Sequence, residues 1–403
     1  MKQTWRWFGP HDTITTADMR QCGVEGVVSA LHHILPGQVW SIQEIEARQA
    51  VISAMPDGTP SGLTWDVVES LPVSETIKTK GPGYADHIAA YKESLRNIAA
   101  CGLEVVCYNF MPILDWTRTD LARRMAHGGT AMYFDLLDFA VFDLHILSRH
   151  GAEADYSPAF AARAADRFAS LSDDAATQLQ NNIVAGLPGA NDNWTLADVQ
   201  THLATYADVD AQQLYANLID FLSEVAPVAQ QLGLRMCCHP DDPPFSLLGL
   251  PRIISRQSDY ARLLADVDLS ANGVTFCTGS LGVAPDFDPV SFVATLGHRI
   301  HFVHLRSTTR EEPSDGAKSS FYEAAHLEGD TDMVATVNAL LEEEVTRRGS
   351  GRSDHQIPMR PDHGQDILDD LRKDSMPGYP LAGRMRGLAE LRGIMAAYAA
   401  SAR

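Results

Sequence analysis

Four apolar segments in the second half of the chain stop abruptly, and each stops at a side chain that can bind a metal ion. The first, residues 234–238, ends at His239 and is followed by three prolines, which cannot donate hydrogen bonds to a strand ladder. The other three end at Cys277, His304 and Asp362. Because the carboxyl ends of parallel strands in a barrel meet on one face, we expect these four side chains to converge there.

Strand and helix alternate along most of the chain, which is typical of a parallel sheet. Capping pairs at Thr15/Asp18 and Ser41/Glu44 mark two of the early helix starts. Eight strands with helices between them predict an α/β protein, a (β/α)8 TIM barrel that forms one catalytic domain over residues 1–403. The predicted strands are residues 4–8, 24–31, 64–68, 104–108, 234–238, 273–277, 300–305 and 356–360.

The alternation breaks between residues 110 and 233, where helical patterns follow one another without a convincing barrel strand. One βα connection needs one helix, so the surplus predicts a helical insertion between strands 4 and 5, over residues 115–210. Such an insertion commonly covers an active site or supplies a subunit contact. Other expected features are helices at 84–100, 136–147, 173–185, 211–231, 332–348 and 388–398, N-caps at Ser172 and Thr195, a helix stop at Gly186, and a polar loop over 307–330.

The charge balance excludes several classes of partner. Asp+Glu 52 against Lys+Arg 32 gives a net charge of -20, a field that repels nucleic acid and anionic membranes. An anionic substrate would then need a local metal ion or arginine to hold it. No segment has membrane-spanning length and the start has no signal core, so we expect a cytoplasmic protein. Its six cysteines include no CxxC pair, which predicts reduced thiols.

His239, Cys277, His304 and Asp362 form a mixed set of nitrogen, sulfur and oxygen donors. Imidazole and carboxylate suit Mn²⁺ or Fe²⁺, whereas a thiolate favours Fe²⁺, Co²⁺ or Zn²⁺. Structural zinc sites usually have short ligand spacings, but these four residues are far apart and meet only if the barrel closes. Each alone is explained as well by a hydrogen-bonded histidine, a packed thiol or a turn residue, so the hypothesis depends on their joint placement.

Polar neighbours of this set have alternative interpretations. Arg306, two residues beyond His304, could hold a substrate carboxylate with both arms of its guanidinium or form a surface ion pair. Asp241 and Asp242 could orient His239 or simply make a turn. His363 could act as an acid or base. A loop tyrosine usually packs, but beside a metal Tyr379 becomes a candidate proton donor or acceptor.

Eight longer motifs extend this pattern over the whole chain. They are TWRW at 4–7, ALHHI at 30–34, VCYNFMP at 106–112, LDWTRTD at 114–120, HPDDPP at 239–244, CTGS at 277–280, HLRS at 304–307 and MRPDHG at 359–364. Through these motifs the chain closely resembles the D-mannonate dehydratases, a metal-dependent family of xylose-isomerase-like barrels. The resemblance includes the insertion.

The resemblance implies loss of water from D-mannonate to give 2-dehydro-3-deoxy-D-gluconate in hexuronate breakdown. It implies Mn²⁺ or Fe²⁺, one ion per subunit, held by the four residues above. It places the catalytic histidine and tyrosine on His363 and Tyr379. Arg306, Asn109, His33 and Arg6 are predicted to bind the small acid-sugar substrate. We expect a homo-oligomer, a dimer or higher.

Three rival functions remain open from the sequence. An aldose–ketose isomerase or epimerase on the same barrel would often use more carboxylates and two metals, whereas Cys277 and Arg306 favour one metal and an acid sugar. A nucleic-acid-processing barrel is disfavoured by the net charge of -20. A non-enzymatic sugar-binding or assembly protein is disfavoured by the intact ligand set.

Overall fold

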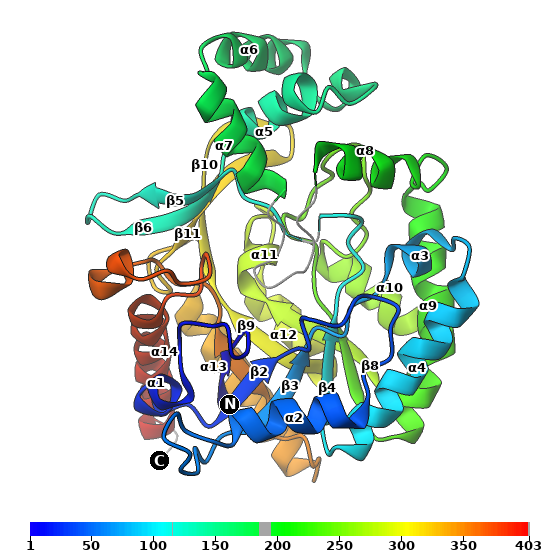
Figure 1. The fold of residues 1–403 in the computed structure, drawn as a ribbon. Helices are drawn as coiled ribbons and strands as arrows, with labels where there is room; N and C mark the ends of the chain where they lie inside the picture. Colours follow the sequence, from blue (N-terminus) through cyan, green and yellow to red (C-terminus); the bar gives the residue numbers. More distant parts are fainter. Residues whose placement is uncertain (115, 185–194, 402–403) are drawn as a thin grey trace.

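The computed structural model describes residues 1–114, 116–184 and 195–401, and its centre is a closed parallel barrel (Figure 1). The strands follow one another around the barrel in the order β1-β12-β9-β8-β7-β4-β3-β2. This confirms the predicted TIM barrel with an insertion between its fourth and fifth strands. The barrel strands are β1 (Lys2–Arg6), β2 (Gly26–Ser29), β3 (Thr64–Glu69), β4 (Val105–Tyr108), β7 (Arg235–Cys238), β8 (Asn272–Cys277), β9 (Ile300–Leu305) and β12 (Pro358–Pro361).

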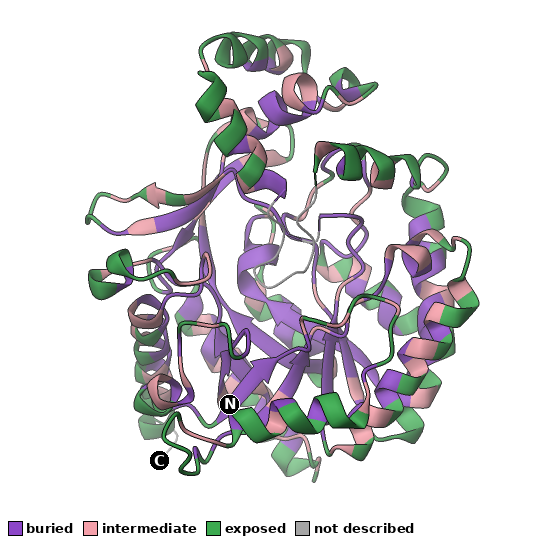
Figure 2. Ribbon diagram, in the orientation of Figure 1, coloured by how far each residue is buried: buried purple, intermediate pink, exposed green. Residues whose placement is uncertain are grey.

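Helices surround the barrel and turn their apolar sides toward it, so burial follows the strands in Figure 2. In α4 (Tyr84–Ala100), Ile88, Tyr91, Leu95 and Ile98 are buried, at the spacing of one helix face. Both predicted N-terminal caps, Thr15 and Ser41, are confirmed. The other surrounding helices are α1 (Thr16–Gln21), α2 (Ile42–Ile52), α3 (Glu75–Thr79), α9 (Ala211–Gln231), α10 (Gln257–Asp266), α11 (Thr278–Gly282), α12 (Pro289–Leu296), α13 (Met333–Gly349) and α14 (Leu381–Ser401).

The barrel interior is filled by side chains rather than open. A separate cluster of buried residues consists of Val28, Val67, Val105, Cys107, Cys237 and Phe302, all from barrel strands. The Phe302 ring meets the His304 ring edge-on, with 4.6 Å between centroids. The cluster therefore supports the His304 side chain from below, as expected for a packed barrel core.

A second sheet outside the barrel corrects two sequence-based expectations. Its order is β10-β11-β6-β5, and β10 (Ser307–Asp315) with β11 (Lys318–Ala324) forms a hairpin directly after β9. The predicted polar loop over 307–330 was therefore wrong. The insertion is also not wholly helical, because β5 (Asp120–Arg124) and β6 (Thr130–Phe134) belong to it. β5 is partly exposed, whereas β6 is mostly buried. Phe134 of β6 stacks on Phe321 of β11 at 5.3 Å, a contact between distant segments that local patterns cannot relate.

The rest of the insertion is helical and extends above the barrel (Figure 1). Thr195 caps a helix as predicted, and Ser172 accepts a hydrogen bond from the Ala175 N–H at 3.2 Å. Gly186 lies outside the described residues, and the boundaries 115–210 stay a prediction. The elements are α5 (Leu136–Val141), η1 (Phe142–Ile146), η2 (Ala152–Asp155), α6 (Pro158–Ala169), α7 (Asp173–Val184) and α8 (Leu196–Ala204).

Helix α14 begins seven residues before its predicted start at residue 388, because a distant carboxylate caps it. Asp370, on the short helix η4 (Leu368–Arg372), accepts hydrogen bonds from the N–H groups of Leu381, Ala382 and Gly383 at 2.9–3.1 Å. This satisfies donors that a helix start leaves unpaired. All six cysteines are free thiols, as expected. Among the described helices, none combines the length and apolarity needed to cross a bilayer.

Candidate active site

The four predicted metal ligands lie together at the carboxyl ends of neighbouring barrel strands. Cys277 of β8 pairs in register with His304 of β9, while His239 and Asp362 directly follow β7 and β12. The ligand atoms of the first three predicted donors, His239, Cys277 and His304, all lie within 4.8 Å of one another. Asp362 Oδ2 lies 3.8 Å from Cys277 Sγ and 3.9 Å from His304 Nδ1. The barrel thus brings His239, Cys277 and His304 together, and Asp362 lies beside the last two.

The chemistry of these donors fits a divalent transition-metal ion. His239 Nδ1 lies 2.7 Å from the Pro240 carbonyl oxygen, so Nδ1 carries the hydrogen and Nε2 keeps its lone pair. Burial lowers the pKa of His239, which favours the neutral ring that metals bind. Among the described residues, the buried Nε2 of His304 makes no hydrogen bond, and Glu69 Oε2 lies 3.5 Å from it. A buried ring nitrogen without a hydrogen bond is costly, so this atom is suited to bind a ligand.

Arginine keeps the nearby carboxylates ionised. Arg360 pairs with Asp362 and contacts Glu69 through two nitrogens at 3.0 and 2.8 Å. Burial alone would raise the pKa of both carboxyls, but Arg360, the next largest influence, holds both pKa values well below the ordinary range. Glu69 was not singled out from the sequence, although it directly follows the predicted strand at 64–68. Its position at the end of β3 is the same signal that identified the four ligands.

Arg306 is buried rather than on the surface, with only 2% of its area exposed. Its guanidinium lies 2.8 Å from Asp242, 3.1 Å from Glu323 and 3.5 Å from Asp362. The alternative of a surface ion pair was therefore wrong. The two-pronged contact that we expected for a substrate is already made to carboxylates of the protein, so substrate binding by Arg306 stays a prediction.

Arg118 completes this buried ion network from outside the barrel. It lies 3.0 Å from Asp242 and 2.6 Å from Glu323, so two arginines alternate with two carboxylates. Arg118 precedes β5, and Glu323 lies on β11. Neither was singled out from the sequence, because the outer sheet that carries Glu323 and begins just after Arg118 was not predicted. Asp242 thus bridges two arginines, while Asp241 accepts hydrogen bonds from Ile254 N–H and Ser255 Oγ, which fix the following loop.

The predicted catalytic pair is in contact. His363 Nε2 lies 3.3 Å from Tyr379 Oη and 3.7 Å from Asp362 Oδ1, so the pair adjoins the ligand set. Both side chains are buried. Burial raises the pKa of Tyr379, although Arg360 and Arg6 oppose this, so the phenol is protonated at neutral pH. The pair therefore offers one phenolic proton and one imidazole at the same place.

The remaining predicted substrate contacts separate into two groups. Arg6 reaches the site, with Nη1 3.5 Å from Glu69 Oε2. Asn109 is half-buried directly after β4, one residue beyond the register pair Tyr108 and Cys238, which places it level with His239. His33 is not brought together with them: its side chain is 56% exposed and pairs with Glu44 at 2.9 Å.

This fold and the titratable side chains gathered at its mouth define an enzyme of the TIM-barrel class. The family model described as D-mannonate dehydratase (UxuA) matches residues 1–403. Mannonate dehydratase 1 of Agrobacterium fabrum is 55% identical over 394 residues, covering 98% of this chain and 96% of the relative. The mannonate dehydratase of Rhizobium meliloti is 53% identical over 394 residues, with the same coverage of 98% and 96%.

A solved structure agrees with the sequence comparisons. The crystal structure of mannonate dehydratase from Streptococcus suis serotype 2 is 31% identical and superposes with a TM-score of 0.75, covering 100% of this chain and 94% of that chain. The chain therefore belongs to the D-mannonate dehydratase family. The resemblance inferred from the sequence is confirmed, and the protein is a hydro-lyase.

Proposed function

We propose that the chain eliminates water from D-mannonate and releases 2-dehydro-3-deoxy-D-gluconate. The observation that carries this proposal is the cluster of His239, Cys277 and His304, whose ligand atoms lie within 4.8 Å of one another, beside the His363–Tyr379 pair. The names of the curated relatives supply the substrate. The geometry supplies the groups that such an elimination needs.

The difficult step is removal of the proton on C2 of the substrate. That proton is weakly acidic, because a neighbouring carboxylate stabilises a carbanion poorly. His239, Cys277, His304 and Asp362 would hold a divalent ion, Mn²⁺ or Fe²⁺, whose positive charge would stabilise the negative charge developing on the substrate oxygens. Arg360 keeps Asp362 ionised and so ready to act as a ligand.

His363 and Tyr379 share the two proton transfers. One removes the C2 proton, and the other assists departure of the C3 hydroxyl as water. Their contact at 3.3 Å supports this assignment, because two groups so close together can act on one substrate. Their burial excludes bulk water from the reacting atoms, which strengthens each electrostatic contact in the site.

The decisive experiment is product analysis after metal removal. The protein is stripped with a chelator and assayed with D-mannonate before and after addition of Mn²⁺ or Fe²⁺. We expect a 2-keto-3-deoxy acid, lighter than the substrate by one water, only after the ion is restored. An isomer of unchanged mass would instead support the isomerase or epimerase alternative.

A variant tests the catalytic pair separately. We expect His363→Asn to abolish turnover while bound metal, measured by elemental analysis, stays at the wild-type level, because the change removes the acid–base group but none of the four ligands. A wild-type rate in this variant would refute the role of His363. One ion per subunit, the homo-oligomer, the hexuronate pathway and the cytoplasmic location stay predictions.

A further inference from the structure

We propose that Glu323 is a positioning residue that holds the His363 ring with its Nε2 atom toward Tyr379. Glu323 does not come from the barrel: it lies on β11 of the outer sheet. The proposal rests on the proposed role of His363 in proton transfer. It gives the hairpin of β10 and β11 a function in the reaction.

The two ring nitrogens of His363 face different groups. Nδ1 lies 3.2 Å from Glu323 Oε1, and Nε2 lies 3.3 Å from Tyr379 Oη and 3.7 Å from Asp362 Oδ1. Among the described residues Nδ1 completes no hydrogen bond, so its contact with the ionised Glu323 is electrostatic. Because a carboxylate accepts hydrogen bonds and cannot donate them, this contact favours the neutral tautomer with its hydrogen on Nδ1. Nε2 then keeps a lone pair, and the Tyr379 hydroxyl donates to it. Glu323 thereby selects the tautomer whose free nitrogen points at the reacting groups.

Glu323 is charged at neutral pH. Burial alone would raise its pKa, but the surrounding positive charges, led by Arg306, outweigh burial and lower the pKa to about 2. Each carboxylate oxygen has its own arginine: Arg118 Nη2 lies 2.6 Å from Oε1, and Arg306 Nε lies 3.1 Å from Oε2. With only 1% of its area exposed, the carboxylate has a fixed direction. It can therefore orient the histidine rather than follow it.

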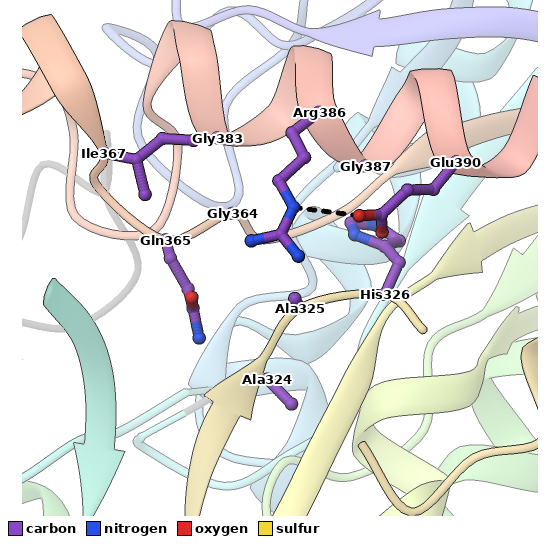
Figure 3. Close-up of a pocket in the computed structure, with 10 residues that line it drawn as sticks. All are labelled: Ala324, Ala325, His326, Gly364, Gln365, Ile367, Gly383, Arg386, Gly387 and Glu390. Atoms are coloured by element: carbon purple, nitrogen blue, oxygen red, sulfur yellow. Dashed lines mark hydrogen bonds and ion pairs between the residues drawn. The ribbon is translucent and has the colours of Figure 1, made fainter. Parts of the chain in front are cut away.

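The backbone around Glu323 is also held in place. Gln365, two residues beyond His363, donates from Nε2 to the Glu323 carbonyl oxygen at 2.9 Å. Behind it, Gln365, Ala324 and residues of α14 line a cavity of only about 10 Å³ (Figure 3), room for about one water molecule. The Arg386–Glu390 ion pair at 2.8 Å lies at this cavity. The close packing leaves β11 little space to move away from the histidine.

Asp242 provides a matched control. It is the other carboxylate between the same two arginines, 3.0 Å from Arg118 and 2.8 Å from Arg306. Asp242→Asn and Glu323→Gln each remove one negative charge from the network with little change in shape. The described contacts place His363 against Glu323, so Glu323→Gln alone removes the charged partner of the ring. The difference between the two variants isolates the positioning effect.

The experiment uses Mn²⁺-loaded protein and measures kcat and KM for D-mannonate, manganese content and Tm. We expect Glu323→Gln to lower kcat about 10- to 100-fold, with KM within about twofold and manganese unchanged. Asp242→Asn should lower Tm by a similar amount but should lower kcat much less. In ¹⁵N-histidine NMR spectra of metal-free protein, which avoids paramagnetic broadening by Mn²⁺, the His363 signals, assigned by their loss in His363→Asn, should show Nδ1–H in the wild type and a mixed tautomer in Glu323→Gln.

Two results would overturn the proposal: a kcat for Glu323→Gln no lower than that for Asp242→Asn, or an unchanged His363 tautomer. If Glu323→Gln loses manganese or fails to fold, Glu323→Asp replaces it, because the shorter carboxylate keeps the charge while withdrawing from Nδ1. The same two criteria then apply. Full activity in His363→Asn would instead reject the proposed function, so the two failures are distinguishable.

Discussion

Two histidines on the same strand, β9, show how differently the two ends of the barrel are built. His304, at the mouth, faces carboxylates, with Glu69 at 3.5 Å and Asp362 at 3.9 Å. His301, toward the opposite end, donates from Nε2 to the Ser270 carbonyl oxygen at 3.0 Å. Burial lowers the pKa of His301 to about 3, and Arg235 and Arg347 act in the same direction. Both rings are buried, but only the one at the mouth is surrounded by acidic groups.

The arginines at the two ends differ in the same way. At the far end, Arg347 donates to the backbone carbonyl oxygens of Gly297 at 2.6 Å and Ile300 at 2.7 Å, besides pairing with Glu343 at 2.8 Å. At the mouth, Arg306 and Arg360 contact side-chain carboxylates around the predicted ligands. Charge at the far end therefore helps to fix the backbone, whereas charge at the mouth controls ionisation of the groups proposed to react. This agrees with the general division between stability and activity in such barrels.

The largest expected effect comes from a substitution in the candidate site at the mouth of the barrel. Cys277→Ala removes one donor from the cluster, so we expect loss of bound metal and a fall in turnover of about 1,000-fold. Cys237→Ala is the matched control, because this thiol is equally buried but belongs to the barrel interior. Elemental analysis and an assay with D-mannonate measure both variants. Equal metal content in the two would contradict the assignment of Cys277.

The next largest effect is on stability and comes from a substitution at the far end of the barrel. Arg347→Met leaves the Gly297 and Ile300 carbonyl oxygens without their charged donor, which should cost about 2–3 kcal/mol of unfolding free energy. The value of kcat should stay within about twofold, because the change lies away from the mouth. Urea unfolding and steady-state kinetics on the same samples check this. A parallel loss of kcat would show that the two ends are coupled.

A smaller effect is expected on the pH dependence of stability. The folded protein holds His301 with a pKa of about 3, below its ordinary value of about 6.5 in an unfolded chain. The unfolded chain therefore binds a proton first, so this stability is present above about pH 6.5 and is lost as pH falls toward 3. When the pH falls from 7.5 to 5.5, the unfolding free energy of His301→Gln should decrease by about 1 kcal/mol less than that of the wild type. Identical pH dependence of unfolding would contradict the neutral, buried His301.

The barrel and the meeting of His239, Cys277 and His304 could be predicted from the sequence because both depend on local patterns. A strand that stops at His239 or Cys277 is visible within a few residues, and closure of the barrel brings such ends together. Glu323 and Arg118 could not be found in this way. They reach the site through an outer sheet whose strands pair across distant segments, and their roles depend on each other rather than on neighbouring residues.

The direction in which a side chain points could not be predicted from the sequence either. His33 gives the smallest expected effect among these variants. His32 and His33 both follow β2, but His33 turns to solvent and pairs with Glu44. We therefore expect His33→Ala to change kcat/KM for D-mannonate by less than about twofold, because an exposed ion pair contributes little. Arg6→Lys is the contrasting variant, since Arg6 lies 3.5 Å from Glu69 inside the site. A large rise in KM for His33→Ala would restore its predicted contact with substrate and would mean that the rim of the barrel closes over the bound sugar acid.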